Sequence, residues 1–335
     1  MILYILCVII LIWLWIKSRF WNRQPMSHIY NFPKSGILSL EPTLNKYVDI
    51  PNVHFYPVHE LTELQKNEIY EYVKEKQPSF HKQSHFFGYL KKAYLSVHRD
   101  LNEIITGCIT SRHVTFTLNK VSMDAYYTDF IFADTSFILK KLIQTHEYIK
   151  HTHCPLTLFS SSKISFLVPL TTYSIAWVHT NSFQKYKFPL KTRILKAVPE
   201  TLISVYDCFK KPFQCQMIPS MYQLSRLIQS KNISIYYIYN PYLVAVLFFK
   251  NTCELYNDLS IVDWVGTILL DKKNMDIVKN VISTILNGIQ TTFKIVRIHQ
   301  VSDTPSYSSF KKTECVKYVY NYGISSVPPS KCLFI

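Results

Sequence analysis

Ala125-Tyr126-Tyr127-Thr128-Asp129-Phe130-Ile131-Phe132-Ala133 is the stretch that decides the fold, because it leads directly from a strand into a helix. Aromatic and β-branched residues dominate it, which favours a strand. Asp134-Thr135-Ser136 follow, and Asp134 or Ser136 is expected to cap the helix. The helix should bury the apolar positions that recur at helical spacing, namely Ile138, Leu139, Leu142, Ile143 and Ile149.

The neighbouring segments predict further elements of the same unit. Residues 60–77 read as an amphipathic helix, with Thr62 as its candidate cap. Residues 94–99 and 103–118 read as strands, and a short strand at 156–159 follows the central helix. The order is therefore helix, three strands, helix, strand.

This order occurs a second time, at an offset of about 140 residues. The second set comprises a helix at 221–229, strands at 233–239, 243–249 and 259–270, a helix at 275–290 and a strand at 293–299. Repeats of this length are too long for solenoid units. The sequence therefore predicts an α/β (α+β) fold of two tandem, duplicated units with mixed, mostly antiparallel sheets.

The first sixteen residues contain no charge and are followed by Lys17, Arg19 and Arg23. Sixteen helical residues span about 24 Å, and Phe20 and Trp21 would extend the helix toward a bilayer core of about 30 Å. We therefore expect an N-terminal transmembrane helix. The positive-inside rule then predicts a single-pass membrane localisation with the globular part facing the cytoplasm. The alternative is a short helix docked on the domain.

The composition narrows the classes of partner and cofactor. The eight cysteines form no CxxC pair, which is typical of reduced thiols, so we expect no zinc or other metal site. The net charge is +15, but Lys and Arg are scattered along the chain, so we expect no nucleic-acid partner. An anionic membrane surface or a phosphate-bearing ligand accounts for the same charge. Frequent Lys, Asn, Ile and Tyr are typical of an AT-rich genome such as that of a large DNA virus.

Several short strings, in order along the chain, resemble the N-myristoyltransferase family, which duplicates the GNAT acyltransferase unit. Asp129-Phe130-Ile131-Phe132-Ala133 resembles its strand Asn-Phe-Leu-Cys-Val, and Ile105-Thr106-Gly107-Cys108-Ile109 resembles the preceding Val-Gly-Phe-Ile. Three further matches follow: Val168-Pro169 with Trp177-Val178-His179, Tyr318-Val319-Tyr320-Asn321-Tyr322, and the apolar end Lys331-Cys332-Leu333-Phe334-Ile335. The resemblance covers residues from about 52 to 335 and marks the chain as a divergent member.

We expect the chain to divide into an anchor with a basic flank, a linker, two GNAT-like domains and a bridging segment. The boundaries are 1–24 for the anchor, 25–52 for the linker, 53–180 for the first domain, 181–218 for the bridge and 219–335 for the second domain.

The resemblance also implies the chemistry of the site. Backbone N–H groups of Phe130 and Ile131 would stabilise the negative charge that develops on a thioester carbonyl. The α-carboxylate of Ile335 would act as the base that accepts a proton from the acceptor amine. Because any residue supplies an α-carboxylate, the departure of Ile335 from the family's usual ending leaves this role intact.

Coenzyme binding is where the chain departs from the family. The resemblance assigns it to Phe132, Ala133, Lys140 and Lys141, with acyl-CoA, such as myristoyl-CoA, as the substrate. The family's basic loop between strand and helix is missing here, and Asp134 stands in its place. An aspartate at a helix N-terminus repels a phosphate, and Lys140 and Lys141 lie a turn inside the helix.

Two functions therefore remain open. The first is a membrane-anchored acyltransferase that moves a fatty acyl group from acyl-CoA to an amine, such as a peptide N-terminal glycine. The alternative is a catalytically inactive relative that serves as a structural or binding scaffold at a membrane.

Overall fold

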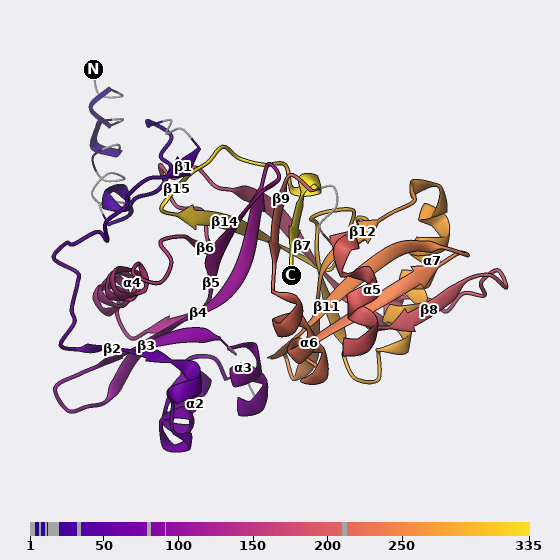
Figure 1. Ribbon diagram of the computed structural model, residues 1–335, viewed down its shortest axis with the longest axis horizontal. Helices are drawn as coiled ribbons and strands as arrows, with labels where there is room; N and C mark the ends of the chain where they lie inside the picture. The colour runs from indigo at the N-terminus through magenta and orange to yellow at the C-terminus, as the bar shows by residue number, and fades with distance from the viewer. Residues whose placement is uncertain are drawn as a thin grey trace.

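A computed structural model describes residues 4–6, 8–10, 12, 20–31, 35–78, 82–90, 92–209 and 213–335. Within them, a 14-stranded mixed sheet runs through the molecule (Figure 1). Its strand order is β16-β9-β4-β5-β6-β14-β7-β13-β12-β11-β10-β8, with β3 beside β4 and β2 beside β3. Strands β1 (Gly36–Ile37) and β15 (Tyr322–Gly323) form a separate two-stranded sheet.

The first set of elements occupies the N-terminal half. Its strands are β2 (Val53–Pro57), β3 (Ala93–Arg99), β4 (Ile105–Leu118), β5 (Val121–Ala133) and β6 (Thr157–Ser161). Its helices are α2 (Glu63–Lys76), α3 (Gln83–Tyr89) and α4 (Ser136–Lys150), preceded by the 3-10 turns η1 (Trp21–Arg23) and η2 (Val58–Glu60).

The second set repeats this arrangement. Its strands are β8 (Arg193–Lys196), β10 (Ile233–Tyr239), β11 (Leu243–Tyr256), β12 (Leu259–Leu269) and β13 (Ile295–His299). Its helices are α5 (Pro199–Phe209), α6 (Met221–Gln229) and α7 (Met275–Gly288), with 3-10 turns η3 (Thr180–Ser182) and η4 (Lys272–Asn274).

Four further strands join the two sets. They are β7 (Thr171–His179), β9 (Cys215–Ile218), β14 (Lys311–Tyr320) and β16 (Cys332–Phe334), the last preceded by η5 (Pro329–Lys331). Strand β7 follows β6 in the chain but pairs with β13, whereas β14 follows β13 but pairs with β6. Because β7 and β14 also pair with each other, the sets exchange strands and share one sheet.

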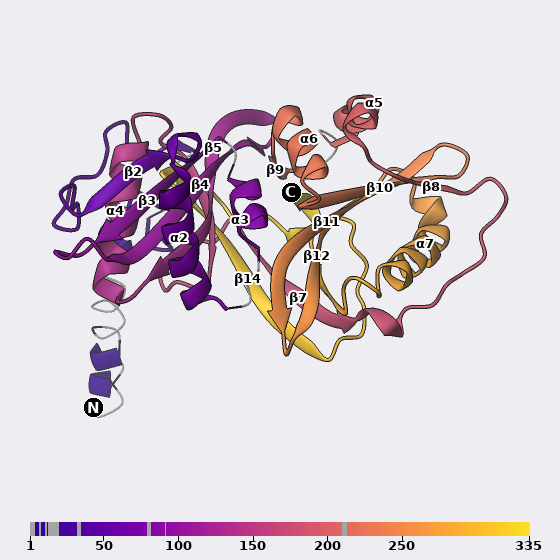
Figure 2. The same ribbon diagram turned by 90° about the horizontal axis from the view of Figure 1, so that it is seen from below.

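Helices cover each half of this sheet (Figures 1 and 2). Helix α4 packs on β2 to β5, and α7 packs on the second half through Val278, Val281 and Ile282. The largest apolar cluster lies between the halves and draws side chains from α2, α3, α5, α6 and both sets of strands. The chain end lies in this middle region in both views.

Helix α4 departs from its predicted apolar face. Leu142 is fully buried, but the other buried positions of α4 are polar: Gln144, Thr145, His146, Glu147 and Lys150. Its N-cap is Thr135, whose side chain accepts a hydrogen bond from the N–H of Ile138 at 3.2 Å, so the prediction of Asp134 or Ser136 as the cap is wrong. Periodicity of apolar residues did not reveal a second covering layer.

That layer is the segment before β2, which runs across α4. Gln144 accepts hydrogen bonds from the side chains of Gln24 and Asn45 at 2.8 Å, and Thr145 accepts one from the N–H of Asp49 at 2.8 Å. Buried polar groups are stable only when they find such partners. The segment therefore covers a polar helix face and does more than link two parts.

The residues at the end of the predicted anchor belong to this layer. Phe20 is 5% exposed and packs edge-on against Trp21 and Tyr47 at centroid distances of 5.1 and 5.4 Å. Trp21 stacks on Phe159 of β6 at 5.5 Å. Both aromatic residues are thus packed on the domain and do not extend a helix toward a bilayer.

The expectation of an N-terminal transmembrane helix is therefore wrong, and so is the single-pass localisation facing the cytoplasm. In the part of the chain that the structure describes, every helix is too short or too polar to cross a bilayer. Residues 4–6, 8–10 and 12 are helical, whereas 1–3, 7, 11 and 13–19, with Lys17 and Arg19, lie outside the described residues. Sixteen apolar residues are also fewer than the roughly 20 that a span requires.

Replacing Phe20 by Ala tests the docking of this segment. Because the ring is buried, F20A should lower the free energy of unfolding by about 3–5 kcal/mol. Chemical denaturation measures it. The matched control is L40A in the same segment, where Leu40 is 87% exposed and the change should stay within about 0.5 kcal/mol. Equal effects of the two substitutions would contradict the docked arrangement.

Candidate active site

The site is built where β5 loses its parallel partner. Strands β5 and β6 pair from Tyr126↔Thr157 to Thr128↔Phe159 and no further along the described residues. Directly after this point the pairing of β5 with β4 shifts, so that Asp129 and Phe130 both lie opposite Thr110. Such a bulge bends a strand and separates its backbone from the neighbouring strand. The edge of β5 from Asp129 to Ala133 is thereby released from β6.

Strand β12 in the second set has the same irregularity. It pairs with β13 as far as Trp264↔Ile298, and Val265 is the extra residue in its pairing with β11. Beyond this point two of its N–H groups donate hydrogen bonds to side chains of the same protein. The N–H of Thr267 donates to Ser302 Oγ and that of Leu269 to Asp303 Oδ2, both at 2.9 Å. The second released edge is therefore occupied by residues 302 and 303.

The correspondence of the two sets identifies the donors of β5. If the last rungs Thr128↔Phe159 and Trp264↔Ile298 are superposed, Ile131 corresponds to Thr267 and Ala133 to Leu269. N–H groups alternate between the two edges of a strand, so those of Ile131 and Ala133 face the released edge. The N–H of Phe130 faces β4 and donates to Thr110 Oγ1 at 3.2 Å.

An apolar cavity lies next to Ile131, between β5 and α4. Its walls come from six elements, η1, β4, β5, α4, β6 and β14, and its volume is about 20 Å³. The lining residues are Trp21, Ile109, Thr128, Ile131, Ile143, Glu147, Thr157, Phe159 and Tyr320. This volume holds about one water molecule, and Trp21 lines it from the segment that covers α4. The cavity is too small for a longer apolar ligand unless its walls move.

The N-terminus of α4 is occupied by internal ion pairs. Asp134 accepts a hydrogen bond from the Tyr72 hydroxyl at 3.0 Å and pairs with Lys76 Nζ at 2.9 Å. Lys141 pairs with Asp49 Oδ2 at 2.7 Å, and Lys140 is half-buried. Burial alone would raise the pKa of Asp49, but the bonds from Lys141 and Asn52 lower it below its usual value. The structure thus pairs Lys141 with Asp49, and its Nζ also lies 4.9 Å from the ring centroid of Phe137 in the first turn of α4.

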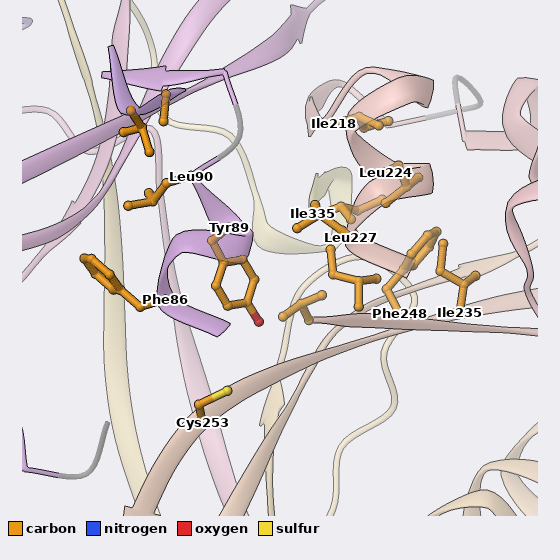
Figure 3. Packing of buried hydrophobic residues seen from close by; sticks show 14 of the residues in the cluster. Phe86, Tyr89, Leu90, Ile218, Leu224, Leu227, Ile235, Phe248, Cys253 and Ile335 are labelled. Carbon is orange, nitrogen blue, oxygen red and sulfur yellow. The ribbon is translucent and has the colours of Figure 1, made fainter. Parts of the chain in front are cut away.

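Ile335 reaches the central cluster. Strand β16 runs parallel to β9, and the N–H of Ile335 donates to the carbonyl of Met217 at 3.0 Å. Figure 3 shows Ile335 beside Leu224 and Leu227 of α6, with Tyr89 of α3 in the same cluster. Phe130 and Phe132 pack against this cluster as well. The structure therefore brings Ile335, Phe130 and Phe132 into one region.

A buried ion pair, absent from the sequence predictions, connects the same groups. Arg112 Nε lies 2.7 Å from Asp129 Oδ2, and its Nη2 donates to the Ile335 main-chain oxygen at 3.4 Å. Lys250 Nζ lies 3.8 Å from the other oxygen of Asp129. Burial would raise the pKa of Asp129, but Lys250 and Arg112 lower it below its usual value. The carboxylate is therefore held in its charged form.

Lys317 completes this cluster from β14. Its Nζ donates to the hydroxyls of Tyr127 and Ser160 at 3.1 and 2.9 Å and lies 5.0 Å from the ring centroid of Phe334. No motif marked Arg112, Lys250 or Lys317 in the sequence. The sequence offered one usable signal of their role: each is a charged residue within a strand whose other positions are largely apolar.

A histidine between two serines is also buried, under α4. His146 hydrogen bonds to Ser96 and Ser111 at 2.8 Å each, and Ser111 to Thr128 at 2.9 Å. Burial lowers the pKa of His146 well below its usual value. Because His146, Ser96 and Ser111 have no exposed surface, the row stabilises the layer between helix and sheet and is no candidate for nucleophilic catalysis.

The fold, with two sets of elements that share one mixed sheet, matches that of solved N-myristoyltransferase structures. No family model matches the chain, and no curated protein matches it in sequence. The fold is similar to that of Saccharomyces cerevisiae N-myristoyltransferase with bound myristoyl-CoA and inhibitors, at a TM-score of 0.73 and 12% identity over 94% of this chain and 93% of that one.

Two further structures of the same yeast enzyme with bound myristoyl-CoA agree. One has a TM-score of 0.70 at 12% identity, covering 93% of this chain and 90% of that one. The other has a TM-score of 0.66 at 11% identity, covering 92% and 94%. The resemblance predicted from the short strings is thus confirmed at the level of the fold. Among the described residues, no group of His, Cys, Asp and Glu side chains has the arrangement of a metal site.

Replacing Asp129 by Asn tests the buried ion pair. D129N leaves Arg112 without its counter-charge and should lower the free energy of unfolding near pH 7 by about 3–5 kcal/mol. Because the pKa of Asp129 is lower in the folded than in the unfolded state, its contribution is present above about pH 4 and is lost as the pH falls through the folded value. Denaturant titrations of both proteins at pH 7 and at about pH 3 should show the difference shrinking; a constant difference would rule out the charged pair.

Proposed function

We propose that this chain is an acyltransferase that moves a fatty acyl group from an acyl-CoA thioester to an acceptor amine. One observation carries the proposal: the released edge of β12 is filled by Ser302 and Asp303, whereas the equivalent edge of β5 ends beside the central cluster that contains Ile335. The similarity to yeast N-myristoyltransferase structures with bound myristoyl-CoA supports the choice of acyl-CoA.

The proposed mechanism assigns the backbone donors first. The N–H groups of Ile131 and Ala133 bind carbonyl oxygens of the coenzyme arm and of the thioester, and preorganised donors stabilise the oxyanion of the tetrahedral intermediate. The N–H of Phe130 faces β4 and donates to Thr110 Oγ1, so in this mechanism Phe130 holds the bulge in place while the N–H of Ile131 binds the thioester oxygen. Phe132 packs the strand against the central cluster. Lys140 is the cation proposed to reach the coenzyme phosphates.

The amine forms a C–N bond to the acyl carbon, the C–S bond of the thioester breaks and coenzyme A leaves as its thiolate, while the amine proton is accepted at the chain end. The α-carboxylate of Ile335 acts as the base for the attacking amine. Its main-chain oxygen accepts a hydrogen bond from Arg112, which pairs with Asp129 next to Phe130, and a base must be within hydrogen-bond reach of the proton. The acyl chain occupies the apolar cavity beside Ile131, which opens when Trp21 leaves its stack on Phe159. The acceptor in this proposal is an amine that attacks in its uncharged form, such as the deprotonated N-terminal glycine of a peptide.

A second candidate function is a binding protein without catalysis. It is favoured by the N-terminus of α4, where Lys76 pairs with Asp134 and Asp49 pairs with Lys141, so the charges nearest the expected phosphate position are already used. The two functions differ in whether the native chain binds acyl-CoA at all.

Thermal unfolding with and without myristoyl-CoA distinguishes them. A ligand that binds only the native state at 100 times its dissociation constant stabilises it by about 2.7 kcal/mol, so the midpoint should rise by several degrees. Free coenzyme A without the acyl chain is the control and should give a smaller shift. A midpoint that does not move at saturating myristoyl-CoA would contradict the enzyme and favour the binding protein.

Adding residues after Ile335 tests the base. Three added glycines move the α-carboxylate away from the cluster, so acyl transfer to a glycine-initiated peptide, followed by mass spectrometry, should fall by at least about 100-fold, the usual contribution of a general base. Binding of myristoyl-CoA should persist. Undiminished transfer by the extended chain would exclude Ile335 from this role.

A further inference from the structure

We propose that Arg112 is a specificity-determining residue, whose guanidinium fills the cation position of the acceptor site and thereby selects against acceptors that carry an ammonium group. The inference rests on the proposed function in one respect, namely that the acceptor approaches beside Phe130. It narrows the acceptor class from amines in general to nucleophiles that are uncharged when they bind.

The cation position is formed by three groups around the Arg112 guanidinium. The Asp129 carboxylate lies 2.7 Å from Nε, the Ile335 main-chain oxygen lies 3.4 Å from Nη2, and the Tyr127 ring centroid lies 5.3 Å from Cζ. A carboxylate, a main-chain oxygen and the face of an aromatic ring are the groups that bind a cation in proteins. The side chains of Arg112 and Asp129 are only 6% and 7% exposed.

This position adjoins the proposed reaction centre. Asp129 and Phe130 form the bulge opposite Thr110, and Arg112 lies two residues beyond Thr110 on β4. Ile335 belongs to the cluster against which Phe130 packs. An ammonium group that approached this centre would therefore have to share Asp129 and Ile335 with the guanidinium.

A second cation strengthens the exclusion. Lys250 Nζ lies 3.8 Å from Asp129 Oδ1 and 4.6 Å from the ring centroid of Tyr89, which holds it over the same carboxylate. Both oxygens of Asp129 thus face positive charge. Like charges at such distances repel strongly in a buried site, so the native centre favours a neutral amine or a hydroxyl over an α-ammonium.

Two roles of Arg112 can be told apart, namely a purely structural ion pair with Asp129 and a guanidinium that fills a cation position. In both cases, removing the guanidinium lowers the thermal midpoint. Only the filled position, once emptied, should bind a small ammonium ion of the shape that Arg112 keeps out. The difference is measured on the full chain without acyl-CoA, so a failure of the proposed acyl-CoA chemistry does not affect it.

The experiment compares thermal midpoints of the wild type, R112A and R226A with glycinamide as the ammonium probe. N-acetylglycinamide, which lacks the charge, is the control ligand. Arg226 is the matched arginine, since it is exposed on α6 and hydrogen bonds to Gln229 at 3.2 Å. Glycinamide should raise the midpoint of R112A by about 2 °C or more and leave the wild type and R226A unchanged.

R112Q is measured in parallel, because it keeps the stem of the side chain over Tyr127 and is the milder change if R112A folds poorly. It should respond to glycinamide in the same direction. The proposal is overturned if glycinamide fails to stabilise the folded Arg112 variants, if N-acetylglycinamide stabilises them equally, or if wild type and R226A respond as they do.

Discussion

Strand β5 keeps its parallel partner β6 for three rungs, and the candidate site follows from the place where that pairing stops. Backbone N–H groups are strong donors that require acceptors. In β12 the same interruption is resolved inside the chain, since Ser302 and Asp303 accept from Thr267 and Leu269. In β5 the corresponding N–H groups, of Ile131 and Ala133, face the edge along which the pairing with β6 has ended at Thr128↔Phe159. In the second set the released edge of β12 is thus filled by the chain's own residues, whereas in the first set the released edge of β5 is the one proposed to bind the ligand.

The strand exchange explains why the two edges lie in one molecule-wide sheet. Strand β7 follows the first set in the chain but pairs with β13 of the second, and β14 follows the second set but pairs with β6 of the first. Each set is therefore completed by a strand from the other half of the chain. The exchange also brings Lys317 on β14 and the end of β16 to the region of Asp129. Charges from β4, β5, β11 and β14 consequently meet where the sets join, as Arg112, Asp129, Lys250 and Lys317.

Much of the fold was accessible from the sequence, because local signals and tertiary structure agree there. Helix α6 and strand β10 have the predicted bounds, and Thr62 is the N-cap of α2 as predicted, where the structure adds a capping box with Gln65. The prediction failed where a residue serves a distant partner. Gln144 and His146 look like the solvent face of α4 until the covering segment and the β-sheet supply their hydrogen bonds, and Phe20 looks like a membrane flank until Tyr47 packs on it. Arg112 gave no signal, because its meaning depends on Asp129 and Ile335.

Amide hydrogen exchange along β5 and β12 tests the central claim most directly. If the edge of β12 is filled from within the chain and that of β5 is the ligand edge, Thr267 and Leu269 exchange slowly at all times. Ile131 and Ala133 should exchange faster in the free protein and slow down when myristoyl-CoA is added. Equal protection of the two pairs before the ligand is added, or no change at Ile131 and Ala133 after it, would contradict the account.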